Sequence, residues 1–295
     1  MRVLLTNDDG YDAPGLASLY EALCGMDAVE GVWVVAPKKV QSATSHAITL
    51  HRLLEVERRN APGSGGPATA KFLGGWAVDG RPADCVKLAL DSEAGLLAGG
   101  VDLVVSGTNA GANIGLNVLY SGTVGAAREA GFAGVPAIAV SQLLRVWADS
   151  PWERSGEFAA EAMTRVLEHR SLGEWEHGTV MNINLPALEA GAEPRGIVPA
   201  ELCMDHVAGV YERREVEDDG DGQGGAAGEV GGAGGRYRMA FQAGSTLNYG
   251  EPPTGTDAAE LFAGWTTVTP LHFDLTHAGE VAAMRQRWEV AETPG

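Results

Sequence analysis

Short apolar runs alternate with segments of helical periodicity along the first two thirds of the chain. The predicted strands, which read as buried on both faces of a sheet, cover residues 3–5, 32–37, 101–105, 135–140 and 180–185. The predicted helices cover residues 14–25, 82–90, 121–130 and 152–169. Strands and helices that alternate on this scale predict an α/β fold with a mostly parallel, doubly wound sheet.

The pattern changes beyond residue 190. Strand-like stretches at 208–216 and 236–242 flank a Gly-rich, acidic loop at 218–235, so they predict an extended β-hairpin joined by a flexible loop. A further strand at 265–275 and a last helix at 278–288 follow. Earlier in the chain, segments 48–56 and 72–78 also resemble a hairpin. We therefore divide the chain into a catalytic core at 1–190, a hairpin region at 191–255 and a C-terminal strand and helix at 256–295.

Charge and composition exclude several classes of partner. The 295 residues carry a net charge of -18, which disfavours binding to nucleic acid polymers or anionic membranes. No apolar run approaches the ~20 residues that span a bilayer. Three widely spaced cysteines do not form a disulfide framework or a cysteine zinc site. These features, with no evident signal peptide, predict a cytoplasmic protein.

Three predicted strands of one sheet end in oxygen-bearing side chains. Asp8 and Asp9 follow the first strand, Ser42 follows the second, and Asn109 follows the strand at 101–105. Because ligands collect beyond the carboxyl ends of parallel strands, these residues are expected to face one crevice. Two carboxylates, a hydroxyl and an amide oxygen suit Mg²⁺, Mn²⁺ or Ca²⁺. Taken one at a time, each residue is also consistent with a turn or a helix cap.

A second candidate site opens the helix predicted at 121–130. Ser121, Gly122 and Thr123 place free backbone N–H groups, the helix dipole and two hydroxyls at one point, which favours a phosphate. An ordinary serine N-cap on a tightly packed helix explains the same residues. His46, in the loop that contains Ser42, is a candidate acid for a leaving group, although a loop histidine is more often incidental. Asn182 and Asn184 either line the crevice or bond to backbone.

Several motifs in the right order resemble those of the SurE family of metal-dependent 5'-nucleotidases. They are Thr6-Asn7-Asp8-Asp9-Gly10, Gln41-Ser42 with Ser45-His46, Val78-Asp79-Gly80 with Pro82-Ala83-Asp84-Cys85, Ser106-Gly107-Thr108-Asn109, Tyr120 to Ala127, Asn182 to Pro186 and Val268 to Leu271. The likeness spans most of the chain. It implies a Rossmann-like core and hydrolysis of nucleoside 5'-monophosphates, with 3'-monophosphates and short polyphosphate as further substrates of some members.

The resemblance also implies roles for individual residues. One divalent cation per subunit would be held by Asp8, Asp9, Ser42 and Asn109, and the phosphate would lie among Asn113 and residues 121–123. Homodimers or homotetramers would form through the C-terminal hairpin. The sequence departs from the family at Lys38-Lys39, where Asp-Arg is usual, at Ala43, where glycine is common, at Arg81, where threonine is frequent, and in the loop at 218–235. These departures bear on substrate preference and assembly more than on the reaction.

The predicted reaction is attack of water on the phosphate, assisted by a cation and oriented by Asp8 or Asp9. A covalent aspartyl-phosphate is less favoured, since metal-bound carboxylates are weak nucleophiles. The main alternative is a non-catalytic nucleotide-binding regulatory protein whose helix terminus binds phosphate without hydrolysing it. The glycine spacing after residue 106 disfavours a dinucleotide-dependent oxidoreductase.

Overall fold

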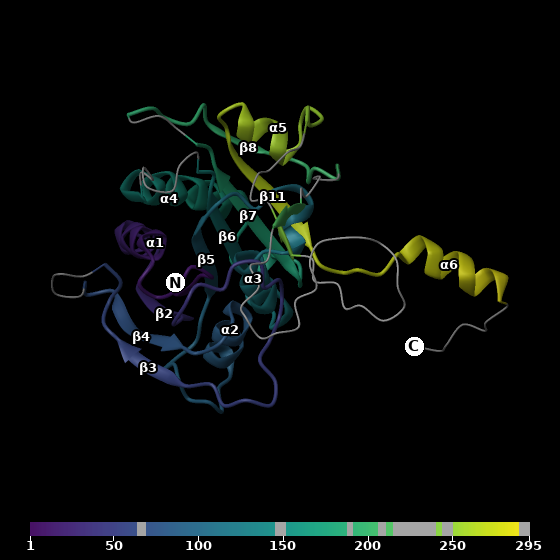
Figure 1. Cartoon of the computed structure of the whole chain (residues 1–295). Helices are drawn as coiled ribbons and strands as arrows, with labels where there is room; N and C mark the ends of the chain where they lie inside the picture. Colours follow the sequence, from purple (N-terminus) through teal and green to yellow (C-terminus); the bar gives the residue numbers. More distant parts are fainter. Residues whose placement is uncertain are drawn as a thin grey trace, which may run out of the picture.

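The computed structural model describes residues 1–63, 69–144, 152–187, 191–205, 211–214, 240–243 and 250–288. Within these residues nine strands form one mixed sheet, in the order β3-β4-β2-β1-β5-β6-β7-β11-β8 (Figure 1). The strands are β1 (Arg2–Thr6), β2 (Gly31–Pro37), β3 (Val56–Arg59), β4 (Phe72–Val78), β5 (Leu103–Ala110), β6 (Ala137–Gln142), β7 (Thr179–Leu185), β8 (Ile197–Pro199) and β11 (Thr266–His272). The β3–β4 and β7–β11 pairs are antiparallel and the other neighbouring pairs are parallel.

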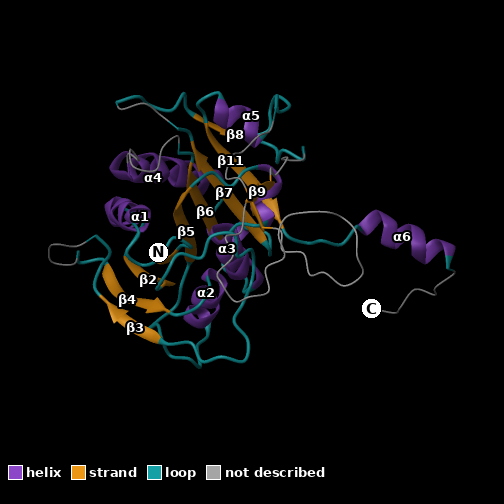
Figure 2. Cartoon of the chain, viewed as in Figure 1, coloured by secondary structure: helices purple, strands orange, loops and turns teal. Residues whose placement is uncertain are grey.

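Helices cover both faces of the sheet, as the alternating pattern predicts. Helices α1 (Pro14–Gly25) and α4 (Trp152–His169) lie on one face, and α2 (Pro82–Leu90) and α3 (Gly122–Phe132) lie on the other (Figure 2). On β1, Leu4 belongs to the core under α2 and α3 and Leu5 to the core under α1 and α4, and both are fully buried. The short apolar run is therefore confirmed as a strand buried on both faces, which places the turn after it at the middle of the sheet edge.

The C-terminal part adds strands to the same sheet. β8 and β11 lie beyond residue 190, and β11 pairs with β7, so the sheet continues past the predicted end of the core. Strands β9 (Tyr211–Arg214) and β10 (Ala240–Ala243) form a separate antiparallel pair, as the predicted hairpin requires. The loop at 218–235 lies outside the described residues.

Four further helical segments lie in the described ranges. They are the 3₁₀ helices η1 (Gly115–Leu119) and η3 (Leu172–Glu174) and the α-helices α5 (Asp257–Phe262) and α6 (Ala278–Arg287). Figure 1 shows α6 standing away from the sheet, near the C-terminus. No helix in the described ranges is both long and apolar enough to cross a membrane.

The strand predicted at 48–56 is wrong in its bounds. The structure has extended pairing only from Val56, where β3 begins antiparallel to β4. The residues before it are held by a side chain, because both the backbone N–H and the hydroxyl of Thr49 donate to the carboxylate of Asp84, at 2.8 and 2.6 Å. Leu50 and Leu53, which made the segment look like a strand, are 65% and 88% exposed.

The strand predicted at 101–105 is longer than expected. β5 runs from Leu103 to Ala110, with an irregularity between Ser106 and Asn109 in its pairing with β6. Asn109 is therefore the second-to-last residue of β5 and does not lie in a loop after the strand. The irregularity shifts the register of the strand end relative to β6 at the position of a candidate ligand.

Candidate active site

A hydrogen-bonded turn after β1 presents the two carboxylates. The side chain of Asn7 is fully buried, donates to the carbonyl of Gly10 at 2.9 Å and accepts from its N–H at 3.2 Å. Gly10 has φ +103°, which an L side chain rarely adopts, so glycine suits this turn. The two bonds fix the positions of Asp8 and Asp9 at the middle of the sheet edge.

Asp8 is buried between the turn and the start of α3. The hydroxyl of Thr123 donates to its Oδ1 at 2.6 Å, and only 4% of the residue is exposed. A Cβ on Gly122 would lie 2.9 Å from Asp8 Oδ2, so only glycine leaves room for the carboxylate. Burial, with a smaller contribution from the neighbouring Asp9 charge, raises the pKa of Asp8 to about 7, although the Thr123 hydrogen bond lowers it.

Asp9 connects the same turn to the end of β5. The backbone N–H of Ala110 donates to Asp9 Oδ2 at 2.9 Å, and burial raises the pKa of this carboxyl. Asn109 precedes Ala110, and its amide nitrogen donates to the carbonyl of Gly111 at 2.6 Å. This bond occupies the amide nitrogen, so the oxygen of Asn109 is the atom that could serve as a ligand.

The loop that contains Ser42 reaches the turn through its backbone. The N–H of Gln41 donates to the carbonyl of Asp8 at 2.7 Å, and the hydroxyl of Thr44 donates to the carbonyl of Gln41 at 2.8 Å. Ser42 itself is exposed. Backbone and side-chain hydrogen bonds thus bring the ends of β1 and β5 and the loop after β2 together. Ser42 lies on the solvent-exposed side of that loop.

The donor set fits a divalent cation with oxygen ligands. Asp8 and Asp9 are adjacent and partly or fully buried, and neither has an ion pair with a described Lys, Arg or His. Two buried carboxylates without a positive partner are unfavourable unless a proton or a cation neutralises them. The described ranges hold no group of three His, Cys, Asp or Glu side chains that could bind a metal, so a cation here would also need the hydroxyl and amide oxygens.

The start of α3, where the sequence predicts a phosphate site, is also held by helix-capping hydrogen bonds. The hydroxyl of Ser121 accepts a hydrogen bond from the N–H of Val124 at 3.0 Å, so Ser121 is the N-cap of α3. The hydroxyl of Thr123 is directed to Asp8. The helix N-terminus therefore lies against the carboxylate pair, and a phosphate beside both would meet positive helix dipole and acidic side chains together.

Asn113 is fixed by three polar side chains from β6 and β7. Asn182 and Asn184 donate to its carbonyl at 2.7 and 3.1 Å, and its own N–H donates to Asn184 Oδ1 at 2.8 Å. Its amide nitrogen donates to the hydroxyl of Ser141 at 2.8 Å. The two strand asparagines bond to the backbone of the loop that contains Asn113 and so hold this loop over the sheet edge.

Asp257, the first residue of α5, ties the C-terminal segment to this loop. It is fully buried and accepts from the N–H groups of Gly115 at 2.8 Å, Cys203 at 2.9 Å and Ala258 at 2.8 Å. Burial raises its pKa despite these three bonds. The sequence marks Asp257 only as a helix start, because the contact joins residues 142 positions apart.

Replacing Asp257 with alanine is expected to lower the free energy of unfolding by about 3 kcal/mol, because three buried N–H groups lose their acceptor. Urea unfolding followed by circular dichroism measures this loss. Asp257→Asn keeps one acceptor oxygen and should lose less. Asp274→Ala, which removes an exposed carboxylate, is the matched control and should change stability little. Equal stability of Asp257→Ala and the control would contradict this role.

His46 lies in a different set of contacts. Its Nε2 is 2.7 Å from Glu129 Oε2, and Arg128 Nε donates to its Nδ1 at 2.8 Å. An Nδ1 that accepts from arginine leaves Nε2 as the protonated nitrogen, which then donates to Glu129. Both ring nitrogens are thus engaged on α3. In this geometry His46 joins its loop to that helix, and its part as the acid for a leaving group stays a prediction.

The family model of the survival protein SurE matches residues 3–208, a range that contains each candidate ligand. The chain belongs to the SurE family. It is 38% identical to the 5'-nucleotidase SurE of Carboxydothermus hydrogenoformans, over 94% of this chain and 92% of that protein, and 39% identical to that of Desulforamulus reducens, over 94% of each.

A solved SurE structure has the same fold. The SurE protein from Aquifex aeolicus matches with a TM-score of 0.70 and 28% identity, over 98% of this chain and all of that one. The similarity therefore extends beyond the part matched by the SurE family model, to the C-terminal strands and helices. The mostly parallel α/β fold predicted from the sequence is confirmed.

Proposed function

We propose that the protein is a metal-dependent phosphatase that hydrolyses nucleoside 5'-monophosphates to nucleoside and phosphate. The observation that carries the proposal is the Asp8–Asp9 pair, in which Asp8 is buried against the start of α3 and Asp9 is partly buried. A protein that only binds phosphate gains nothing from two carboxylates beside an anion unless a cation intervenes. The name 5'-nucleotidase, which the relatives carry, supports the same reaction.

Asp8, Asp9, Ser42 and Asn109 are the residues that would hold the cation. A divalent ion bound there would neutralise phosphate charge and acidify a water molecule. Mg²⁺ and Mn²⁺ fit this ligand set, and Ca²⁺ fits it as well.

The protein residues have separate parts in the proposed reaction. Asn113 and the N-terminus of α3, at residues 121–123, hold the phosphate oxygens. Asp9 orients the attacking water and accepts its proton, because its carboxylate has one backbone donor and is less buried than that of Asp8. Asp8, fixed by Thr123, would mainly hold the cation. Water attacks phosphorus in line with the P–O ester bond, which breaks as the new P–O bond forms. The 5'-oxygen leaves with the electron pair of the broken bond and takes a proton from solvent water to become the nucleoside hydroxyl.

A nucleotide panel with and without metal tests the proposal. Purified protein treated with EDTA should release no phosphate from AMP, and addition of MnCl₂ should restore release. Binding of AMP without phosphate release under any metal would instead favour the nucleotide-binding regulatory protein. The same panel, extended to 3'-AMP and tripolyphosphate, tests whether these are further substrates. Light scattering tests the proposed assembly as a dimer or tetramer through the β9–β10 hairpin.

A further inference from the structure

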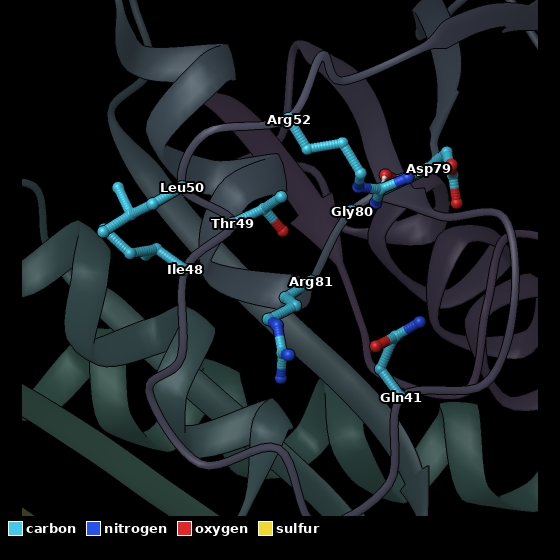
Figure 3. Close-up of a pocket in the computed structure, with 8 residues that line it drawn as sticks. All are labelled: Gln41, Ile48, Thr49, Leu50, Arg52, Asp79, Gly80 and Arg81. Atoms are coloured by element: carbon cyan, nitrogen blue, oxygen red, sulfur yellow. Dashed lines mark hydrogen bonds and ion pairs between the residues drawn. The ribbon is translucent and has the colours of Figure 1, made fainter.

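A pocket of about 420 Å³ opens between the loop after β2 and the turn before α2 (Figure 3). Its lining residues come from the loop after β2, from the segment before β3 and from the turn before α2: Gln41, Ile48, Thr49, Leu50, Arg52, Asp79, Gly80 and Arg81. The proposed reaction at Asp8 and Asp9 uses none of these side chains. The pocket therefore needs an explanation of its own.

Gln41 joins this pocket to the proposed active site. It lines the pocket, and its backbone N–H donates to the carbonyl of Asp8 at 2.7 Å. One backbone hydrogen bond thus connects the pocket wall, in the loop after β2, to the carboxylate turn. A substrate whose phosphate lies at Asp8 and Asp9 can extend into it.

The charges in the pocket leave one arginine unpaired. Arg52 donates to the carboxylate of Asp79 at 2.6 Å and to its carbonyl at 2.7 Å, and these contacts lower the pKa of Asp79. The guanidinium of Arg81 has no hydrogen bond and no ion pair with any described residue. Figure 3 shows it directed away from the Arg52–Asp79 pair, between Gln41 and Ile48.

The buried carboxylate of Asp84 has no ion pair with the guanidinium of Arg81. Asp84 accepts from the backbone N–H of Arg81 at 2.8 Å and from the N–H and hydroxyl of Thr49 at 2.8 and 2.6 Å. These three donors satisfy the carboxylate oxygens of Asp84. Asp84 is not one of the residues that line the pocket. The lining therefore carries one net positive charge in a chain whose net charge is -18.

We propose that this pocket binds a second phosphate group of the substrate, so that the protein prefers nucleoside bisphosphates to monophosphates. The proposal rests on the phosphatase function proposed above. A free guanidinium offers several N–H donors in a geometry that matches phosphate oxygens. Ile48 and Leu50, which are 40% and 65% exposed, provide an apolar wall for the sugar that joins the two phosphates.

The test compares hydrolysis of adenosine 3',5'-bisphosphate and AMP by the wild-type protein and by Arg81→Thr and Arg81→Lys. Arg81→Thr should raise KM for the bisphosphate roughly tenfold or more, since it removes a charged hydrogen-bond donor, while kcat and the KM for AMP stay unchanged. Arg81→Lys keeps the charge and should recover part of the loss. Arg58→Thr removes an exposed arginine on β3 outside the pocket and should leave both substrates unaffected.

Equilibrium binding of adenosine 3',5'-bisphosphate in EDTA gives a readout that does not depend on turnover. Binding that weakens in Arg81→Thr but not in Arg58→Thr supports the pocket even if AMP is not hydrolysed, in which case only the proposed function fails. If AMP is hydrolysed but the two substrates have equal kcat/KM and Arg81→Thr changes neither KM nor binding, the second-phosphate site is overturned and the phosphatase function stands.

Discussion

Replacing Asp9 with asparagine is expected to lower kcat for AMP hydrolysis by on the order of 10³-fold while the fold is retained. General acid-base catalysis by a positioned carboxylate contributes rate factors of about this size, and asparagine cannot accept the proton of water. The amide keeps an oxygen that can still accept from Ala110, so the end of β5 should stay in place. Steady-state phosphate release in MnCl₂, with circular dichroism as the check on folding, measures the effect.

Asp12 supplies the control for this experiment. It lies two residues after Gly10, is 75% exposed at the side chain and pairs with Arg59 at 2.5 Å. Because exposed ion pairs contribute little, Asp12→Asn should leave activity and stability nearly unchanged. Turnover of Asp9→Asn close to that of Asp12→Asn would refute the assignment of Asp9.

The exchange of Gly122 for alanine is expected to reduce kcat/KM by about 10²-fold. The new Cβ would lie 2.9 Å from both Cβ and Oδ2 of Asp8 and 3.0 Å from the hydroxyl of Thr44, so one of these groups has to move. Displacements of this kind in a catalytic group cost about this factor. The stability of helix α3 itself should rise, since alanine is a better helix former than glycine.

Gly25→Ala provides the matched variant. Gly25 ends α1, and nothing lies within 4 Å of the Cβ that alanine would add. Its activity should equal that of the wild type. Full activity of Gly122→Ala would mean that Asp8 does not need its present position, and the proposed arrangement of carboxylate and helix start would have to be abandoned.

The carboxylate turn could be predicted from the sequence because it depends on local pattern. The apolar run of β1 ends at Thr6, and parallel strands bring their carboxyl ends to one edge, so proximity of Asp8 and Asp9 to the end of β5 follows. The apolar pattern alone gave the wrong start for the strand predicted at 48–56. Leu50 and Leu53 are exposed, and Asp84 binds this segment in place of a strand partner.

Contacts between residues far apart in the chain could not be predicted. Asp257 reads as an ordinary helix start, yet it accepts from Gly115 and Cys203 in the folded chain. His46 reads as a loop histidine near a site, but packing of its loop on α3 gives both ring nitrogens other partners. In each case a tertiary contact determines the role of the side chain, and a single sequence does not record such contacts.

Measurement of Mn²⁺ binding by electron paramagnetic resonance tests most directly whether Asp8 and Asp9 hold a cation. The signal of free Mn²⁺ should fall by one equivalent per wild-type subunit. The variant with both Asp8→Asn and Asp9→Asn should leave that signal unchanged, and Asp12→Asn should bind as the wild type does. Binding of one Mn²⁺ by the double variant with wild-type affinity would contradict the proposed metal site.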